Sequence, residues 1–294
     1  MIQQEDPVDV EVEESRRRSV LKMKLKILEK DHRRIKLLIE EAPLPLVNAI
    51  RRLAISDVPT LAIDEVAFLD NTSVLYDEII AHRLGLIPLT TDLSRFKPPE
   101  ECEGANPISN PECYTRLFLD VEAKRDYEII YSGDLQSEDP TVKPVTDKVP
   151  IAILAKGQKI TLEAYARLGR GKEHIKWSPV SISAHKYVPK IRIDMRKCNL
   201  CGKCVEECPK NILFIENNSL KVKNVLECTL CKACEEICEP QAIMVSWVEN
   251  SYVLTIESTG ALPPETIISE AAKILEKKSE EFIKHVEELK KVSR

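Results

Sequence analysis

The stretch Cys198-Asn199-Leu200-Cys201-Gly202-Lys203-Cys204-Val205-Glu206-Glu207-Cys208-Pro209 carries four cysteines at the spacing C-x2-C-x2-C-x3-C. The same spacing recurs thirty residues later, at Cys228, Cys231, Cys234 and Cys238. The repeat indicates an internal duplication with one set of four thiols in each half. We therefore predict a small domain at residues 192–245 that is built around metal ligation.

Two [4Fe-4S] clusters fit this spacing. Three thiolates on a tight loop can cap three corners of a cubane, and the fourth can reach the cluster of the other half, as in bacterial-type ferredoxins. The predicted ligands of the first cluster are Cys198, Cys201, Cys204 and Cys238. The predicted ligands of the second cluster are Cys228, Cys231, Cys234 and Cys208.

Three alternatives stay open for these cysteines. The first half reads Cys208-Pro209 whereas the second reads Cys238-Glu239-Pro240, and this extra residue favours a labile cluster or a [3Fe-4S] cluster at one site. Two four-cysteine zinc sites are a second alternative, although zinc has no use for a third cysteine at the same pitch. Disulfides are the third, and they are more typical of small secreted proteins.

Two further cysteines, Cys102 and Cys113, lie in a proline-rich stretch at 96–113, which we expect to be a long surface loop. Two cysteines alone do not make a zinc site. We interpret them as a pair of free or opportunistically bridged thiols.

Composition narrows the class of protein. The 294 residues suggest about two domains, or three if one is small. A net charge of −5 argues against a protein that binds DNA independently of the base sequence. The sequence has no apolar run of about eighteen residues that could span a membrane, and its acidic N-terminus does not match a signal peptide. We expect a cytoplasmic protein whose residues 1–18 form a mobile end.

Hydrophobic periodicity predicts a mixed α+β fold. The predicted elements are, in chain order, a hairpin with strands at 23–27 and 35–39, a helix at 43–58, a β-rich stretch at 60–188 with a short helix near 75–84, a strand at 252–257 and a helix from 264 to about 291. The first helix has two faces. Its apolar face carries Leu46, Ile50 and Leu53. The opposite face carries Arg51 and Arg52, which are either exposed to solvent or in contact with a partner.

The last helix has more apolar surface than a small domain covers. Its apolar residues recur at steps of three and four, at Ile268, Ala271, Leu275, Phe282, Val286 and Leu289. A helix of about 28 residues is roughly 42 Å long. Burial of six such side chains stabilises by about 10–18 kcal/mol before entropy losses. Packing wholly on its own domain is one alternative, but we favour a partner helix from another subunit.

Four other stretches carry a more specific signal. They are Asn48-Ala49-Ile50-Arg51-Arg52-Leu53 within 48–64, Ile80-Ala81-His82-Arg83-Leu84-Gly85 within 80–89, Leu168-Gly169-Arg170-Gly171 within 168–179, and Glu257-Ser258-Thr259-Gly260 within 257–262. In this order, with a ferredoxin-like insert before the last strand, they resemble the α-like subunits of RNA polymerase, and in particular the D-type subunits of archaea. The resemblance covers about residues 18–290.

The resemblance implies an α+β fold of three parts. A discontinuous α-like dimerisation domain would comprise 18–60 and 246–294, a β-rich insert domain 61–191, and a ferredoxin-like domain 192–245. The dimerisation domain would pair helix to helix with the small subunit L. The candidate interface residues are Leu46, Ile50, Leu53, Arg51, Arg52, Ile268, Leu275, Phe282 and Val286.

The same resemblance implies a non-catalytic assembly role in RNA polymerase. Subunits N and P and the large B-type subunit would be neighbours, and the catalytic magnesium would lie in the largest subunits. The absence of a D-x-D-x-D motif from this sequence agrees with that. Several relatives bind zinc through four cysteines in the loop after the 80–89 motif, but only Cys102 and Cys113 are present here.

Two other function classes compete with the assembly role, namely a ferredoxin-type electron-transfer protein and an iron–sulfur enzyme subunit. Both need a flavin, nicotinamide or substrate site. The nearest approach to G-x-G-x-x-G starts at Gly169 and fails because His174 stands where the last glycine is required. We therefore expect clusters that are mainly structural, and no direct sequence-specific binding to DNA.

Overall fold

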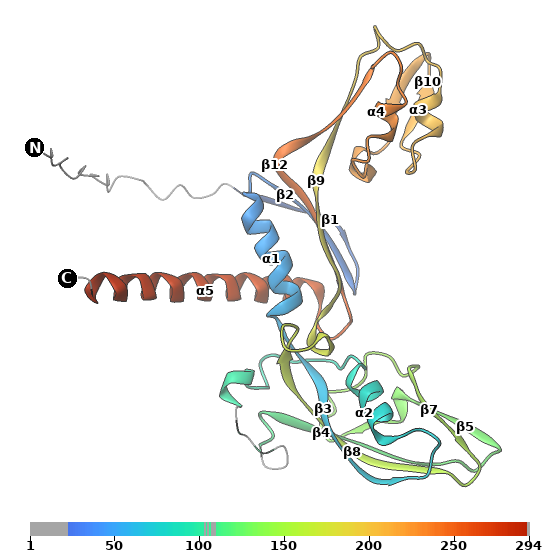
Figure 1. The fold of residues 1–294 in the computed structure, drawn as a ribbon, viewed down its shortest axis with the longest axis vertical. Coiled ribbons are helices and arrows are strands. Elements are labelled where there is room, and N and C mark those ends of the chain that lie inside the picture. Colours follow the sequence, from blue (N-terminus) through green and yellow to red (C-terminus); the bar gives the residue numbers. More distant parts are fainter. Residues whose placement is uncertain (1–22, 103, 105, 107–109, 293–294) are drawn as a thin grey trace, which may run out of the picture.

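The computed structural model describes residues 23–102, 104, 106 and 110–292. The predicted mobile end at 1–18 lies outside the described residues. Three parts follow one another along the long axis: a β-rich part, a central sheet with two helices, and a small cysteine-rich module at the far end (Figure 1). No helix in the described part of the chain is long and apolar enough to cross a membrane.

The central sheet is antiparallel, with the strand order β1-β2-β12-β9. Its strands are β1 (Lys24–Lys30), β2 (Arg34–Glu40), β9 (Val180–Ile193) and β12 (Ile243–Ser258). The predicted hairpin is confirmed as β1 and β2. It turns at Asp31, whose carboxylate accepts hydrogen bonds from the backbone N–H groups of Arg33 and Arg34 at 2.8 and 2.7 Å.

Helices α1 (Leu44–Ser56) and α5 (Pro264–Val292) pack together on this sheet, and both predicted helices are confirmed. Prolines precede or open both helices, where their missing N–H costs nothing. The shared core consists of apolar side chains from β2, β12 and the two helices, among them Ile35, Leu37, Val47, Leu53, Ala54, Tyr252, Leu254, Ile267 and Ala271.

Strand β9 belongs to the central sheet, although the predicted β-rich insert at 61–191 included most of it. Its register with β12 runs from Val180 opposite Ser258 to Ile193 opposite Ile243. Without β9, the long strand β12 would have a buried edge of unpaired backbone groups. Periodicity predicts that a segment is a strand, but it does not say which sheet the strand joins.

The β-rich part has its own core. A four-stranded sheet has the order β3-β8-β4-β6, and a two-stranded sheet pairs β5 with β7. The elements are β3 (Pro59–Asn71), α2 (Asp77–Gly85), β4 (Tyr114–Glu122), β5 (Tyr127–Tyr131), β6 (Gln136–Ser137), β7 (Pro150–Ala155) and β8 (Lys159–Arg170), with short 3₁₀ turns at Pro99–Glu101, Ser132–Asp134 and Ile175–Trp177. The predicted short helix is confirmed as α2.

A buried tryptophan locks the β-rich part where it meets the central sheet. Two cations lie near the Trp177 ring, the Arg167 guanidinium 4.4 Å and the Lys176 ammonium 4.2 Å from the ring centroid. Both cations also pair with Asp64, at 2.7 and 2.6 Å. Burial raises the pKa of Asp64, but the hydrogen bonds from Lys176 and Arg167 outweigh it, so the pKa lies below its usual value.

Gly169 leaves the space that this ring fills. A Cβ atom at Gly169 would lie 2.3 Å from Cε2 of Trp177. We therefore expect Gly169→Ala to lower the free energy of unfolding by about 1–3 kcal/mol, the usual cost of overpacking. Gly85→Ala is the matched control, because its Cβ would only approach a backbone oxygen of Ile63 at 3.4 Å. Chemical denaturation compares the two, and equal stabilities would contradict this ring position.

The cysteine-rich module is small and mixed. It contains α3 (Lys203–Glu206), β10 (Leu213–Glu216), β11 (Ser219–Val222), a 3₁₀ turn η4 (Val225–Glu227) and α4 (Ala233–Glu236). Strands β10 and β11 form an antiparallel hairpin. The ends of β9 and β12 nearest the module carry it away from the central sheet (Figure 1). The whole chain is therefore of the predicted α+β class.

Candidate functional site

The cysteines of the module line two separate cavities. The lining of one cavity includes Cys198, Cys201, Cys204 and Cys238. The lining of the other includes Cys208, Cys228, Cys231 and Cys234. The fourth cysteine of each half thus faces the cavity of the other half, which is the crossed arrangement that the spacing predicts.

The duplication is visible in the backbone as well as in the sequence. Leu200 and Leu230, thirty residues apart, both have φ 60°. Gly202 and Lys232 precede α3 and α4 in the left-handed region, with φ 80° and 63°. These conformations bend each loop tightly, so that the three thiols of each loop face one cavity.

No residue is inserted in the second half, so the extra-residue interpretation is wrong. The turns after the fourth cysteines are equivalent, because Asn211 N–H donates to the Cys208 carbonyl at 2.9 Å and Gln241 N–H donates to the Cys238 carbonyl at 2.8 Å. Asn211 and Gln241 both have φ 49°. The proline has only moved one place along an unchanged turn, which removes the argument for a labile or [3Fe-4S] cluster at one site.

The donor set and its surroundings fit an iron–sulfur cluster. Backbone N–H groups of Leu230 and Ala242 donate to the sulfur atoms of Cys228 and Cys238 at 3.4 and 3.2 Å, and such bonds favour a thiolate. Burial and the neighbouring thiols raise the pKa of Cys234 to about 11, so a metal bound there would release the proton of this thiol.

The structure bears directly on the disulfide interpretation of these eight cysteines. All eight cysteines of the module are free, so none forms the alternative disulfides.

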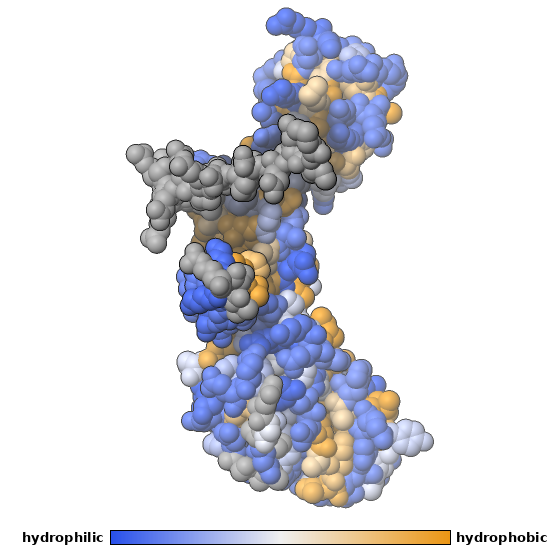
Figure 2. All heavy atoms as spheres, turned by 60° about the vertical axis from the view of Figure 1, so that its left-hand side comes forward, coloured by the Kyte–Doolittle hydropathy of each residue, from blue (hydrophilic) through white to orange (hydrophobic). Residues whose placement is uncertain are grey.

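An apolar groove lies on the central part, between the hairpin and the two helices. We define it by its lining residues, which are Met23, Leu25, Leu37, Ile39, Leu46, Val47, Ile50, Leu254, Ile268, Ala272, Leu275, Glu276 and Ser279. Its volume is about 370 Å³. Figure 2 shows hydrophobic residues gathered beside the end of α5 in this middle part of the molecule.

The groove contains four of the predicted interface residues, Leu46, Ile50, Ile268 and Leu275. The hairpin also contributes to the groove, through Met23, Leu25, Leu37 and Ile39, none of which was among the predicted interface residues. Leu25 in β1 is 59% exposed, because no other part of the described chain covers the apolar face of this edge strand. The alternation of apolar and lysine residues at 23–27 was the signal that could have indicated it.

The second half of α5 extends past α1 and the central sheet (Figure 1). An ion pair of 2.6 Å between Lys278 and Asp57 ties the middle of α5 to the end of α1. Beyond this point Phe282 is 69% exposed, and Val286 is partly exposed. The helix thus continues the apolar surface of the groove outward.

Leu53 does not fit the interface predicted for it. It is 8% exposed and packs in the core between α1 and the sheet. A helix of this amphipathicity has an apolar face wider than the groove, so one edge of the face is buried within the chain. Arg51 is partly buried and bonds to Asn48 at 3.0 Å, whereas Arg52 is exposed.

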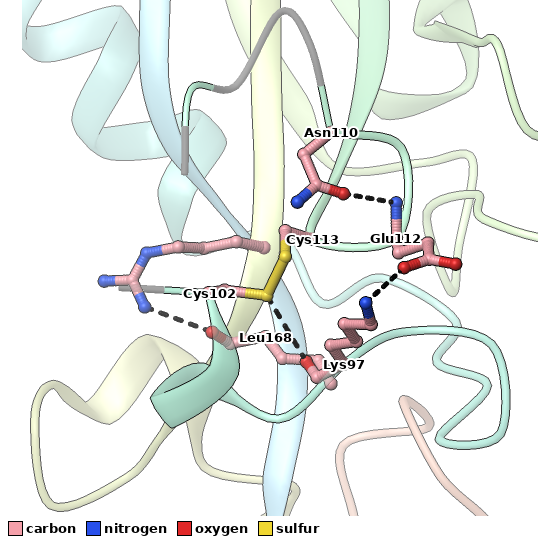
Figure 3. The surroundings of a disulfide bond; sticks show 7 residues. Lys97, Cys102, Asn110, Glu112, Cys113 and Leu168 are labelled. Atoms are coloured by element: carbon pink, nitrogen blue, oxygen red, sulfur yellow. Dashed lines mark hydrogen bonds and ion pairs between the residues drawn. A yellow bond between two sulfur atoms is a disulfide. The ribbon is translucent and has the colours of Figure 1, made fainter. Parts of the chain in front are cut away.

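Cys102 and Cys113 form a disulfide, so the bridged alternative is confirmed for this pair (Figure 3). Their Cα atoms are 5.7 Å apart. Lys97 and Glu112 form an ion pair of 2.5 Å beside the bridge. Cys113 is buried immediately before β4, so the bridge ties the loop to the sheet.

Lys186 on β9 is a residue that the sequence analysis missed, and no motif marks it. Its ammonium donates to the carbonyl oxygens of Leu226 and Cys228 at 2.6 and 3.0 Å. Burial and the nearby charge of Lys36 lower the pKa of Lys186 below its usual value.

Comparison with known families matches two of these parts. Residues 63–189 match the RNA polymerase Rpb3/RpoA insert domain, and residues 190–239 match a 4Fe-4S dicluster domain. The second match contains all eight cysteines of the two cavities.

Whole-chain relatives carry the name DNA-directed RNA polymerase subunit Rpo3. The protein of Methanosphaera stadtmanae is 40% identical over 90% of this chain and 99% of its own length. The protein of Pyrobaculum islandicum is 46% identical over 88% of this chain and 94% of its own length. That of Aeropyrum pernix is 38% identical over 90% and 95%. Because such identity extends over nearly the full length of both chains, the chain belongs to the Rpo3 family, the D-type subunits of archaeal DNA-directed RNA polymerase, and it contains a 4Fe-4S dicluster domain.

Proposed function

We propose that the chain is a non-catalytic assembly subunit of the polymerase, which pairs with the small subunit L through the groove and the second half of α5. The pair is then a platform for subunits N and P and for the large B-type subunit. The observation that carries this proposal is the uncovered apolar surface formed by the groove and by Phe282 beyond it. Exposed apolar patches of this kind mark protein interfaces.

The shape of this surface suits a helix with an adjoining strand from the partner. The groove is open between a hairpin and two helices, and α5 offers a further apolar stripe to a second helix. Burial of the stripe removes side chains such as Phe282 and Leu289, each 69% exposed, from water. Each such burial stabilises by about 1.5–3 kcal/mol.

We also propose that each cavity of the module binds one [4Fe-4S] cluster. Cys198, Cys201, Cys204 and Cys238 would ligate the first. Cys208, Cys228, Cys231 and Cys234 would ligate the second. A bound cluster supplies iron–thiolate bonds that hold the loops together. The role of these residues is then to fold and position the module, since polymerisation chemistry is assigned to the largest subunits.

Co-purification tests the proposed function against ferredoxin-type electron transfer. The tagged chain, isolated anaerobically from its own cells, should bring down an equimolar small subunit and the large polymerase subunits. Recovery of a reductase in place of these subunits would favour electron transfer and reject the assembly role.

The arginine face of α1 gives a separate prediction. We expect Arg51→Glu with Arg52→Glu to leave the pair with subunit L intact but to weaken recruitment of the next subunit, because neither arginine lines the groove. Reversal of two interfacial charges changes such an affinity by about tenfold or more. A reconstitution titration measures it. Unchanged assembly would mean that both arginines contact solvent and not a partner subunit.

A further inference from the structure

One of the two strands that carry the module, β12, has extra residues between the module and the central part of the sheet. Strand β12 pairs with β9 at Val248 opposite Val188, and pairing resumes at Tyr252 opposite Tyr187. Residues 249–251 therefore bulge out of the ladder, and Asn250 has φ 52°. A bulge bends a strand and breaks its hydrogen bonding locally. We call this bulge, residues 249–251 of β12, the hinge.

Lys186 bridges this hinge. Its backbone pairs with Val253, on the side of the central sheet. Its ammonium donates to the carbonyl oxygens of Leu226 and Cys228, which belong to the module. A more exposed ion pair of 3.8 Å, between Lys36 on β2 and Glu227, runs beside it.

We call the two hydrogen bonds from the Lys186 ammonium to the Leu226 and Cys228 carbonyl oxygens the brace. The brace contacts only one of the two cysteine loops. Cys228 is among the residues of the second cavity. By the thirty-residue repeat, the equivalent atoms of the first loop are the carbonyl oxygens of Arg196 and Cys198. Within the part of the chain that the structure describes, no side chain donates a hydrogen bond to either of them. The module is therefore tied to the sheet asymmetrically, through the second loop.

We propose that Lys186 is a positioning residue that couples occupancy of the second cluster site to the central sheet, an inference that rests on the cluster assignment proposed above. A cluster bound at Cys228, Cys231, Cys234 and Cys208 fixes the loop and hence the two carbonyl oxygens. Two fixed acceptors hold the ammonium in one place, and β9 is restrained across the hinge. Loss of the second cluster frees the carbonyl oxygens and releases the brace, whereas loss of the first cluster leaves the brace in place.

Hydrogen exchange of the full chain, purified anaerobically with subunit L, tests the coupling. The proteins compared are wild type, Cys201→Ser, Cys231→Ser, Lys186→Met and Cys231→Ser with Lys186→Met. We expect Cys231→Ser to speed amide exchange at residues 183–190 and 245–255 by about tenfold, which corresponds to a local opening that is about 1.4 kcal/mol easier. Cys201→Ser should leave these segments unchanged.

The lysine variants separate coupling from a general loss of stability. Lys186→Met should reproduce the faster exchange with the iron content unchanged, and its combination with Cys231→Ser should add nothing further. Lys186→Arg should restore slow exchange, because a guanidinium also reaches two acceptors. Lys190→Met, on an exposed position of the same strand, is the control.

Each outcome decides between the two proposals. Normal iron with unchanged exchange in Lys186→Met would overturn the coupling alone. Equal effects of Cys201→Ser and Cys231→Ser would also overturn it, and this comparison does not depend on how well the lysine variant folds. Wild-type protein without iron and sulfide would overturn the cluster assignment, and the coupling with it.

Discussion

Replacement of Leu275 and Phe282 by glutamate is expected to abolish the heterodimer with subunit L. Leu275 lines the groove, and Phe282 lies farther along the same stripe of α5, where it is 69% exposed. Each carboxylate would have to lose water against an apolar partner surface, at a cost of several kcal/mol. A total loss of about 5 kcal/mol weakens the affinity by between three and four powers of ten.

Co-expression followed by size-exclusion chromatography measures this loss. Lys277→Glu with Lys284→Glu is the matched control, because each lysine stands two residues, or about 200° of helix rotation, from a substituted position. We expect the control to keep the heterodimer, and the wild-type chain alone to aggregate or self-associate. A stable stoichiometric pair from the Leu275 and Phe282 variant would mean that α5 is not the interface.

Substitution of Cys201→Ser together with Cys231→Ser is expected to unfold the module and to spare the heterodimer. The core of the module has nine buried residues, and four of these are the cysteines Cys204, Cys208, Cys228 and Cys234. So small an apolar core cannot hold fifty residues by itself. Structural metal ligation in small domains contributes about 10–16 kcal/mol, so its loss exceeds the stability of the module.

The groove is built from the hairpin, α1, α5 and β12, and the module contributes no residue to it. Release of the hinge would loosen β9 locally, but it leaves the apolar surface for subunit L in place. Limited proteolysis and hydrogen exchange should therefore show new cleavage and fast exchange at 194–242. Outside this range, we expect faster exchange only in the strand segments next to the hinge. The double variant Cys102→Ser with Cys113→Ser is the control, since it removes two cysteines but no predicted ligand.

Reconstitution of the complete polymerase with the cluster-free variant decides what the clusters contribute. We expect assembly or stability of the large enzyme to fall while the pair with subunit L persists. A module that stays protected without iron would contradict the stabilising role of ligation. A melted module with normal assembly and transcription would contradict the assembly role and would favour a redox function.

Much of the fold could be predicted from local pattern. Alternation of apolar and charged residues indicated the hairpin, and steps of three and four residues indicated α5, because these periods reflect strand and helix geometry directly. The spacing of the cysteines indicated the module and its duplication, because ligand spacing on a short loop is set by the cluster that it surrounds. Four of the predicted interface residues line the groove. They could be predicted because they belong to the apolar faces of amphipathic helices, and such faces pack against other apolar surfaces.

The remaining features depend on contacts between residues far apart in the chain. Sequence alone suggested an insertion beside Glu239, whereas the backbone keeps one turn and only the proline moves. Leu53 belongs to the same apolar face as Ile50, yet only the packing of α1 on the sheet decides which of them is buried. Strand β9 joins the central sheet because β12 needs a hydrogen-bonding partner along its edge. Lys186 meets Leu226 and Cys228 across forty residues because the hinge brings β9 against η4. Periodicity encodes the faces of single elements, but the assembled chain determines which faces meet, since burial and hydrogen bonding are satisfied over the whole fold at once.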